Sequence, residues 1–378
     1  MAVLTEEQAL LKEQARAWAK EEAPVSRFRE MRDSGAELGF DRDTWSSIAK
    51  LGWPGIVIPE QYGGASMGHL TFGLVLEELG RQLTASPLLA TGLVGATALI
   101  QGGSDEQLRR WLPGVADGTA ILTLAVDGGP RHAPLDPGVT AERSTDGYCL
   151  RGRKTHVLEG LAADALVVST RTTGVAGDPE GVSLLLVDAE VPGLTRKRRS
   201  TADSRGYADL IFEEVQVPES ALLGAPDAAA PLLEAILDRA RAGVAAEMLG
   251  VAAQSFDMTL EYLKTRVQFG QVIGGFQALG HRAAALFSAM ELTRSCVEAA
   301  FQAIDAGADD VPALCSLAKA QACDFVHHMS NELIQMHGGI GMTDEFDAGL
   351  YLKRARALEA TFGNAAFHRD RYATLHGF

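Results

Sequence analysis

The chain has 378 residues, of which 47% are apolar, and its 49 acidic and 34 basic residues give a formal net charge of −15. This length allows two or three structural layers around a full-sized hydrophobic core. The negative charge argues against a nucleic-acid-binding protein, which needs a basic surface. Aromatic residues make up only 6% of the chain, and alanine-rich stretches are frequent, so the composition favours a helix-dominated protein.

The N-terminal segment is charged and amphipathic, and Thr5 followed by Glu6 and Glu7 is typical of a capped helix start. It has no basic start followed by an apolar block, so we expect no signal peptide. The least polar window, residues 83–103, contains Pro87 and several hydroxyl groups. We expect a buried helix there and no membrane insertion.

The nine histidines form no recognisable metal-binding pattern, and we expect no metal site. The four cysteines also lack the spacing of metal ligands. Reduced core thiols are typical of a protein that works in a reducing compartment, so we expect a cytoplasmic protein. These cysteines are Cys149, Cys296, Cys315 and Cys323.

The pattern changes twice along the chain. Helical periodicity runs to about Trp111 and returns at about Ala228. Between them, short β-rich runs alternate with glycine, aspartate and proline clusters, at residues 121–126, 148–152, 165–168, 182–187 and 210–212. The sequence therefore predicts an α+β, mostly α, fold with a helical domain over 1–115, a β-domain over 116–222 and a second helical domain over 223–378.

One long amphipathic helix is expected from Leu232 to Val267, because this stretch has no proline and its apolar residues recur every three or four positions. Glu247 lies in it among small and apolar neighbours. A carboxylate in such surroundings is costly unless it has a partner or a task.

A polar segment with an aromatic residue follows this helix. Arg266 offers an arginine fork, Phe269 an aromatic ring next to Gly270, and Gln277 an amide. This combination suits a phosphate-bearing aromatic ligand. The alternative is that Arg266 and Gln277 are ordinary surface residues at a helix end.

Three groups of residues resemble the signatures of the acyl-CoA dehydrogenase family, and they occur in family order and at family spacing over nearly the whole chain. The first comprises Trp45, Gly52-Trp53, Pro59-Glu60 and Tyr62-Gly63-Gly64. The second comprises Tyr262, Arg266, Gln268-Phe269-Gly270 and Phe276-Gln277. The third comprises Gln335-Met336-His337-Gly338-Gly339-Ile340-Gly341, Glu345 and Lys353-Arg354-Ala355.

The resemblance implies an N-terminal helical domain, a middle β-barrel and a C-terminal four-helix bundle. It also implies an FAD-dependent enzyme that removes an α-proton and a β-hydride from an acyl-CoA, gives a trans-2-enoyl-CoA, and passes electrons to an electron-transferring flavoprotein or a similar acceptor. The implied cofactor-binding residues are Arg266, Phe269, Gln277, Gln335, Gly338 and Gly339. In the family these segments reach a flavin held mainly by a neighbouring subunit, so we expect a homodimer, a homotetramer or an α2β2 heterotetramer.

The reaction needs a carboxylate base, but both usual family positions lack one. The resemblance places them at Phe362, in Thr361-Phe362-Gly363-Asn364, and at Ala240 on the long helix. Glu247 lies two turns beyond Ala240 on nearly the same stripe, about 10 Å along the axis. The motif Ala245-Ala246-Glu247-Met248-Leu249-Gly250 also resembles bacterial members whose base is assigned to this glutamate, some of them acting on steroid side chains. The alternative is that Glu247 pairs with an arginine at a subunit contact.

Asp238 and Arg241 match the family segment that contacts the pantetheine part of acyl-CoA. They are three residues apart on one helix, so a local ion pair is the alternative.

The resemblance weakens in the β-domain. Where the family has a flavin-ring motif, this chain has Ala125-Val126-Asp127-Gly128-Gly129-Pro130, and Leu158 replaces a hydroxyl residue. Asp127 and His156 are candidate substitutes, although solvated loop residues are the simpler interpretation. These losses favour a non-catalytic partner subunit of a mixed oligomer as the alternative function. A flavin monooxygenase or acyl-CoA oxidase on the same fold is a further alternative.

Overall fold

The computed structural model describes residues 4–378, and the chain divides into two compact units that interleave along the sequence. Unit 1 contains the described residues up to Arg29 together with His69–Thr84 and Arg241–Phe378. Unit 2 contains Glu30–Gly68 and Ala85–Ala240.

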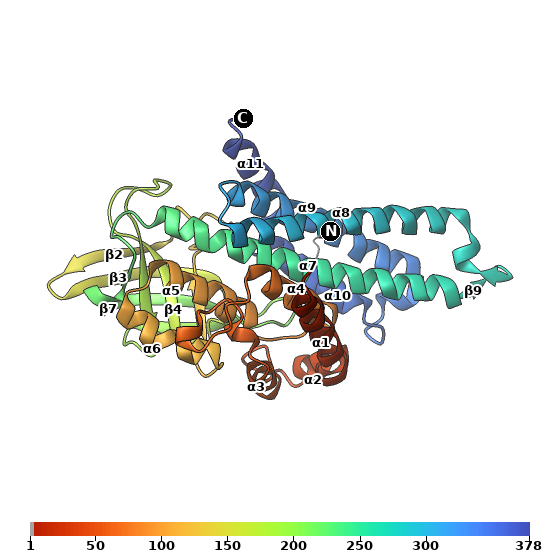
Figure 1. Cartoon of the computed structure of the whole chain (residues 1–378), viewed down its shortest axis with the longest axis horizontal. Helices are drawn as coiled ribbons and strands as arrows, with labels where there is room; N and C mark the ends of the chain where they lie inside the picture. Colours follow the sequence, from red (N-terminus) through yellow and green to blue (C-terminus); the bar gives the residue numbers. More distant parts are fainter. Residues whose placement is uncertain (1–3) are drawn as a thin grey trace. The chain divides into compact units, whose positions relative to one another are not determined.

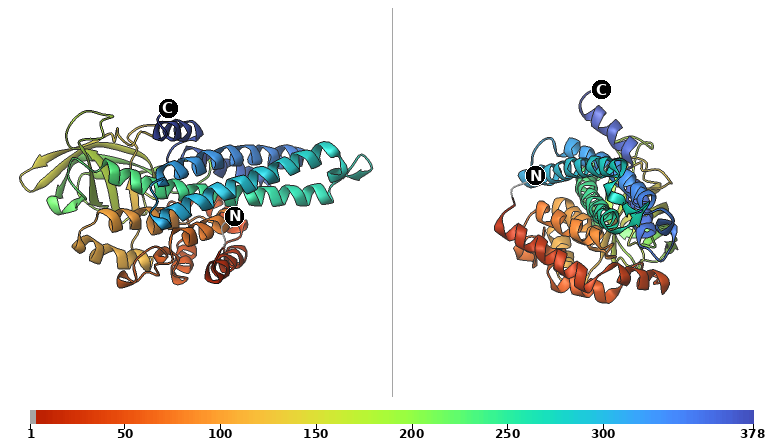
Figure 2. Two further views of the ribbon diagram at one scale, coloured as in Figure 1. Left: turned by 45° about the horizontal axis from the view of Figure 1, so that its top comes forward. Right: turned by 90° about the vertical axis from the view of Figure 1, so that its right-hand side faces the viewer.

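Unit 1 is built from helices and one small hairpin (Figure 1). Its helices are α1 (Glu6–Glu22), the start of α2 (Val25–Asp33), α4 (His69–Arg81), most of α7 (Ala230–Thr265), α8 (Gln277–Ala306), α9 (Val311–His337), α10 (Ala348–Ala360) and α11 (Ala365–Leu375). The hairpin pairs β9 (Val267–Gln268) with β10 (Gln271–Val272) in antiparallel fashion. Within this unit, α8 and α9 run side by side along α7 (Figure 2).

The two expected helix features of unit 1 are confirmed. The long helix α7 is continuous over 36 residues. Thr5 caps α1, because its hydroxyl accepts a hydrogen bond from the Gln8 amide at 3.2 Å while the Gln8 side chain accepts one from the Thr5 amide at 3.1 Å. This reciprocal pair satisfies two amide groups that would otherwise lack a helical partner.

The helices α4 and α7 cross with their backbones in contact. All eleven residues from Leu70 to Gly80 of α4 are buried. A Cβ atom on Gly80 would lie 2.5 Å from the Glu247 carbonyl oxygen, and one on Gly250 would lie 1.9 Å from the Glu77 carbonyl oxygen. Glycine is therefore required at both positions for this approach, which fixes the place of Glu247 in the unit 1 core.

Unit 2 combines three short α-helices, a π-helical segment and an eight-stranded sheet. The helices are α3 (Arg42–Lys50), α5 (Ala96–Gly102) and α6 (Asp105–Ala116), with π-helical backbone over Leu89–Gly95. The strands are β1 (Leu122–Ala125), β2 (Val139–Ser144), β3 (Gly147–Leu158), β4 (Ala165–Arg171), β5 (Val182–Asp188), β6 (Leu194–Arg199), β7 (Tyr207–Pro218) and β8 (Leu222–Leu223). All five β-rich runs expected from the sequence lie on these strands.

The sheet has the order β6-β7-β3-β2-β4-β5-β8, with β1 paired to β4. Its end strands β6 and β8 do not pair with each other within residues 4–378, so the expected barrel is an open sheet. One reason is that β8 has only two residues, which pair with Leu184 and Leu185 of β5. Another is that β6 carries Arg196-Lys197-Arg198-Arg199, and a highly charged strand is typical of a sheet edge.

The apolar window from Leu83 to Gly103 is mostly helical and buried, as expected. It packs beneath the sheet of unit 2, where the Thr91 hydroxyl donates a hydrogen bond to the Leu122 carbonyl at 3.0 Å. Across residues 4–378, no helix combines the length and the apolar character needed to cross a bilayer.

Candidate functional site

Glu247 forms a buried ion pair with Arg354. Its Oε1 atom accepts a hydrogen bond from Arg354 Nε at 2.8 Å and lies 2.7 Å from Arg354 Nη2. The two side chains are only 10% and 7% exposed. The expected partner of this carboxylate is thus an arginine of the same chain, contributed by α10. The ion pair explains how the charge is tolerated in the core, while the role of Glu247 as a base stays a prediction.

A second buried charge cluster of unit 1 is centred on two glutamates of α4. Glu77 lies 2.8 Å from Lys12 Nζ and also pairs with Arg294, and Glu78 lies 3.0 Å from Arg16 Nη2. Burial raises the pKa of Glu77, but the nearby Lys12 and Arg294 outweigh burial and hold that pKa below its ordinary value. This cluster was not predicted from the sequence, although two adjacent acids in the apolar stretch of residues 69–81 are a detectable signal.

Neither usual family base position carries a titratable side chain. Phe362 is 8% exposed and Ala240 is fully buried. The turn around Phe362 is fixed by polar contacts: Lys319 Nζ donates to the Gly363 carbonyl at 2.9 Å, and His368 Nε2 lies 3.1 Å from the Phe362 carbonyl oxygen. Lys319 is fully buried, and burial lowers its pKa. This region is therefore packed as core.

Asp238 and Arg241 are both buried, with 2% and 0% of their surface exposed. The guanidinium carbon of Arg241 lies 5.6 Å from the centre of the Phe367 ring, which belongs to α11. Their expected contact with acyl-CoA stays a prediction, as does the alternative of a local ion pair.

Two predicted cofactor residues of the second motif, Arg266 and Phe269, lie on an exposed arm at the end of α7, and Gln277 follows the arm at the start of α8. We define the arm as residues 264–275, which include the β9-β10 hairpin. Arg266 is exposed where α7 ends, and Phe269 at the hairpin turn is 90% exposed with a φ of +54°. Gln277 is exposed at the start of α8. An exposed arginine beside an unburied ring is the combination that a phosphate-bearing aromatic ligand can use.

The third motif lies next to the base of this arm. The Tyr262 and His337 rings lie 4.3 Å apart, centre to centre, which joins the end of α7 to the end of α9. Gln335 is exposed there. Added Cβ atoms on Gly338 and Gly339 would meet nothing within 4 Å, and Gly338 has a φ of +61°. The two motif segments thus meet at the contact between Tyr262 and His337, and the backbone at Gly338 and Gly339 is open to the approach of a ligand.

The sheet of unit 2 does not offer the usual contacts to a flavin ring. Both Asp127 carboxylate oxygens lie 3.0 Å from His132 Nδ1, and one accepts a hydrogen bond from the Ala133 amide at 3.1 Å. Leu158 is buried, and its carbonyl accepts a hydrogen bond from the Thr123 hydroxyl at 2.6 Å. The Asp127 side chain is thus engaged within its own loop, and the Leu158 side chain is apolar and buried, so both positions fit a flavin ring poorly.

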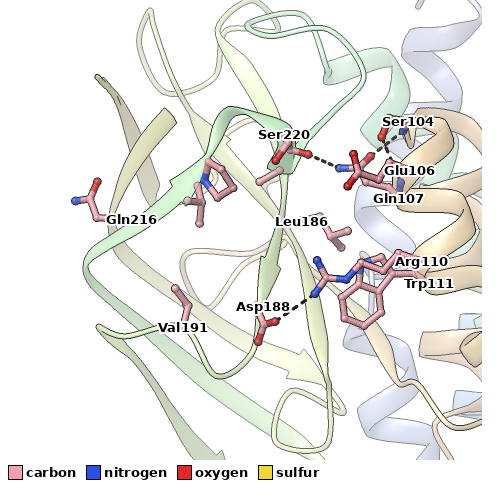
Figure 3. Close-up of a pocket in the computed structure, with 13 residues that line it drawn as sticks. Ser104, Glu106, Gln107, Arg110, Trp111, Leu186, Asp188, Val191, Gln216 and Ser220 are labelled. Atoms are coloured by element: carbon pink, nitrogen blue, oxygen red, sulfur yellow. Dashed lines mark hydrogen bonds and ion pairs between the residues drawn. The ribbon is translucent and has the colours of Figure 1, made fainter. Parts of the chain in front are cut away.

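A small cavity of about 170 Å³ lies in unit 2, between α6 and the sheet (Figure 3). Arg110 stacks on the Trp111 ring at 4.9 Å, and its Nη2 atom lies 3.8 Å from the Asp188 carboxylate. Gln107 donates a hydrogen bond to the Ser220 carbonyl at 2.9 Å (Figure 3). None of the residues predicted for catalysis or cofactor binding lines this cavity. Over the described part of the chain, no group of three or more histidine, cysteine, aspartate or glutamate side chains could hold a metal ion.

Comparison with known proteins identifies the family. Residues 5–119 match the N-terminal domain and residues 231–374 the C-terminal domain of acyl-CoA dehydrogenase. The chain is 32% identical to cyclohex-1-ene-1-carbonyl-CoA dehydrogenase of Geobacter metallireducens, with 91% of each chain covered. Among solved structures it resembles a variant of the Tcur3481-Tcur3483 steroid ACAD, with 33% identity, 98% coverage of each chain and a TM-score of 0.88. It also resembles the ChsE4-ChsE5 complex of Mycobacterium tuberculosis, with 27% identity, full coverage of each chain and a TM-score of 0.88. The chain therefore belongs to the acyl-CoA dehydrogenase family, whose members are FAD-dependent oxidoreductases.

Proposed function

We propose that Glu247 is the base with which this acyl-CoA dehydrogenase removes the α-proton of its substrate. The observation that carries the proposal is the buried carboxylate held by Arg354 in the core of unit 1. Phe362 and Ala240, at the two usual positions, have no group that accepts a proton. A buried titratable group with a defined charge partner is a candidate for general-base catalysis.

The side chains of this protein transfer the proton and orient the substrate. Bound FAD supplies the acceptor for the β-hydride. Glu247 takes the α-proton, and Asp238 and Arg241 orient the pantetheine part of the thioester. Because these two side chains are buried, we expect the side chains that cover them to move when substrate binds. An external flavoprotein then receives the electrons. The four cysteines form no disulfide bonds, which fits a cytoplasmic location.

The arm serves a different flavin from the one beside Glu247. Arg266 lies nineteen residues beyond Glu247, which is about 28 Å along the chain at the helical rise. Arg266, Phe269 and Gln277 would contact the diphosphate and adenine of FAD held by another chain. Gln335, Gly338 and Gly339 would complete that contact.

Exposed apolar side chains support this assembly. They belong to the arm or to the segment after α9, and they are Val267, Phe269, Val272, Ile340 and Met342, with exposed fractions from 40% to 90%. Apolar surface of this kind on a folded chain is typical of a partner interface. An intact site therefore requires at least a dimer.

A heteromer is the second candidate, favoured by one observation. The loop at Asp127 and the buried Leu158 fit a flavin ring poorly in this chain's own sheet. A partner with an intact sheet would then bind the flavin ring, and this chain would complete that flavin site through the arm without carrying out the chemistry itself. Two similar structures are complexes of two named chains, ChsE4-ChsE5 and Tcur3481-Tcur3483. The second of these is a steroid ACAD, which supports a bulky acyl group as substrate.

The first experiment is a visible spectrum of the purified protein, with any chain that copurifies, before and after anaerobic addition of acyl-CoA thioesters. The panel comprises butyryl-CoA, octanoyl-CoA, cyclohexanecarbonyl-CoA and a steroid side-chain CoA thioester. Flavin absorbance that bleaches supports the dehydrogenase. If the chain expressed alone is colourless while the sample with a copurifying chain contains flavin, the heteromer is supported.

The second experiment tests Glu247 directly. Glu247→Gln should abolish bleaching and turnover while FAD stays bound. Glu261→Gln is the matched control, because Glu261 is an exposed glutamate on the same helix, and its turnover should equal that of the wild type. Near-normal turnover of Glu247→Gln contradicts the proposal.

A further inference from the structure

Arg354 contacts the carboxylate of Glu247 in a specific way. Two of its nitrogens, Nε and Nη2, lie 2.8 Å and 2.7 Å from the same oxygen, Oε1. Two contacts from one planar guanidinium to the same oxygen hold Oε1 in a defined position, and with it the end of the Glu247 side chain. A lysine at this position would supply the charge without the planar fork.

The arginine is itself held in place by its helix. One turn earlier on α10, the Tyr351 hydroxyl donates a hydrogen bond to the Arg81 carbonyl at 2.7 Å, which ties α10 to the end of α4. The same α4 helix contacts the backbone of Glu247 through Gly80. Contacts with α4 therefore hold both Glu247 and the helix that carries Arg354.

We propose that Arg354 is a positioning residue for catalysis, which holds the Glu247 carboxylate in place to face the α-carbon of the thioester. This inference rests on the proposed function of Glu247. In the proton-transfer step, the bond between the α-carbon and its hydrogen breaks, and an O–H bond forms on Glu247. The electron pair stays with the α-carbon and spreads into the thioester carbonyl. The guanidinium loses its negative partner in this step, so its buried positive charge stabilises the negative charge that develops on the substrate.

The test is Arg354→Lys, which keeps a buried cation and removes the fork, with Lys353→Ala as the control. Lys353 is the adjacent residue and is exposed. With the fastest thioester of the panel above, we expect kcat of Arg354→Lys to fall by about 10²-fold, the loss that a misplaced catalytic group of this kind causes. KM and FAD content should stay within about threefold, the size of change that ordinary context produces, and Lys353→Ala should match the wild type.

An isotope effect separates positioning from a merely structural role. The same thioester carrying deuterium at the α-carbon should show a larger isotope effect on kcat with Arg354→Lys than with the wild type, because proton abstraction becomes slower relative to the other steps. A variant that only folds less well has fewer active sites and an unchanged isotope effect.

The outcomes distinguish this inference from the proposed function. If Glu247→Gln is inactive but Arg354→Lys keeps its kcat, or loses kcat with an unchanged isotope effect, the positioning role is wrong and the base assignment stands. If Glu247→Gln keeps its turnover, or the assembled wild type turns over no thioester, both are wrong. If Arg354→Lys does not fold, Arg354→Gln assayed with added guanidinium ion replaces it, and recovery of kcat by guanidinium supports positioning while no recovery contradicts it.

Discussion

Replacing Gly250 by alanine tests the backbone contact between α4 and α7. The new Cβ atom would lie 1.9 Å from the carbonyl oxygen of Glu77 and 2.9 Å from its carbonyl carbon. Both are backbone atoms, so the two helices must separate. Alanine gains about 1 kcal/mol over glycine in a helix, whereas overpacking costs about 1–3 kcal/mol and sometimes more. Since the obstacle is backbone, we expect the higher cost and a net loss of about 1–2 kcal/mol in the free energy of unfolding.

Gly280→Ala is the matched control, because Gly280 also lies in a helix, α8, and an added Cβ would meet nothing within 4 Å. This variant should gain up to about 1 kcal/mol. Urea unfolding followed by circular dichroism measures both variants in parallel. Equal stabilisation of the two would refute the argument that α4 and α7 touch through glycine.

Gly250→Ala should also lower the rate of the catalysed reaction. Gly250 is three residues from Glu247, so a separation of the helices there shifts the carboxylate relative to Arg354. We expect kcat of Gly250→Ala to fall at temperatures at which the variant is still folded. An unchanged kcat in a destabilised variant would show that the Glu247 carboxylate tolerates displacement of its helix.

Three further predictions concern the rest of unit 1. The folded-state pKa of Glu77 lies below its ordinary value of 4.5, so its stabilising contribution is present above that pH and declines as the pH falls through the folded pKa. Glu77→Gln should therefore show a weaker fall in stability than the wild type as the pH is lowered below 4.5, measured by urea unfolding. An unchanged slope over that range contradicts this. Thr5→Ala removes the cap of α1 and should cost about 1 kcal/mol in thermal unfolding, while Thr5→Ser should not. Tyr262→Leu removes the ring contact with His337, which is worth about 0.5–1.5 kcal/mol. This variant should bind FAD roughly 2- to 10-fold more weakly in a flavin fluorescence titration. An affinity equal to that of the wild type would show that the arm does not contribute to FAD binding.

Local patterns predicted the elements of this fold well. The long helix, the cap at Thr5 and the β-rich runs depend on neighbouring residues, and each was confirmed in place. The closed barrel was not confirmed. Closure depends on whether the end strands β6 and β8 pair with each other. Neither the two-residue length of β8 nor the pairing of strands far apart in the sequence can be predicted from a local residue pattern.

The partner of Glu247 shows where sequence reasoning ends. The isolated acid in an apolar helix predicted that some partner or task exists, and Arg354 was noted only as part of a family motif. The two residues are 107 positions apart, so their pairing follows from the packing of α10 against α7. The buried position of Arg241 was equally hidden, because a charged residue on a helix is normally expected at the surface.

The exposed arm makes the chain susceptible to proteolytic degradation in the cell. Lys264, Arg266 and the hairpin turn at Phe269 project into solvent at the far end of a long helix, and exposed loop tips are the preferred sites of proteolytic cleavage. Whatever covers this tip also shields it from proteases. In the proposed assembly, a chain made in excess of its partner would leave this tip uncovered and should be degraded first.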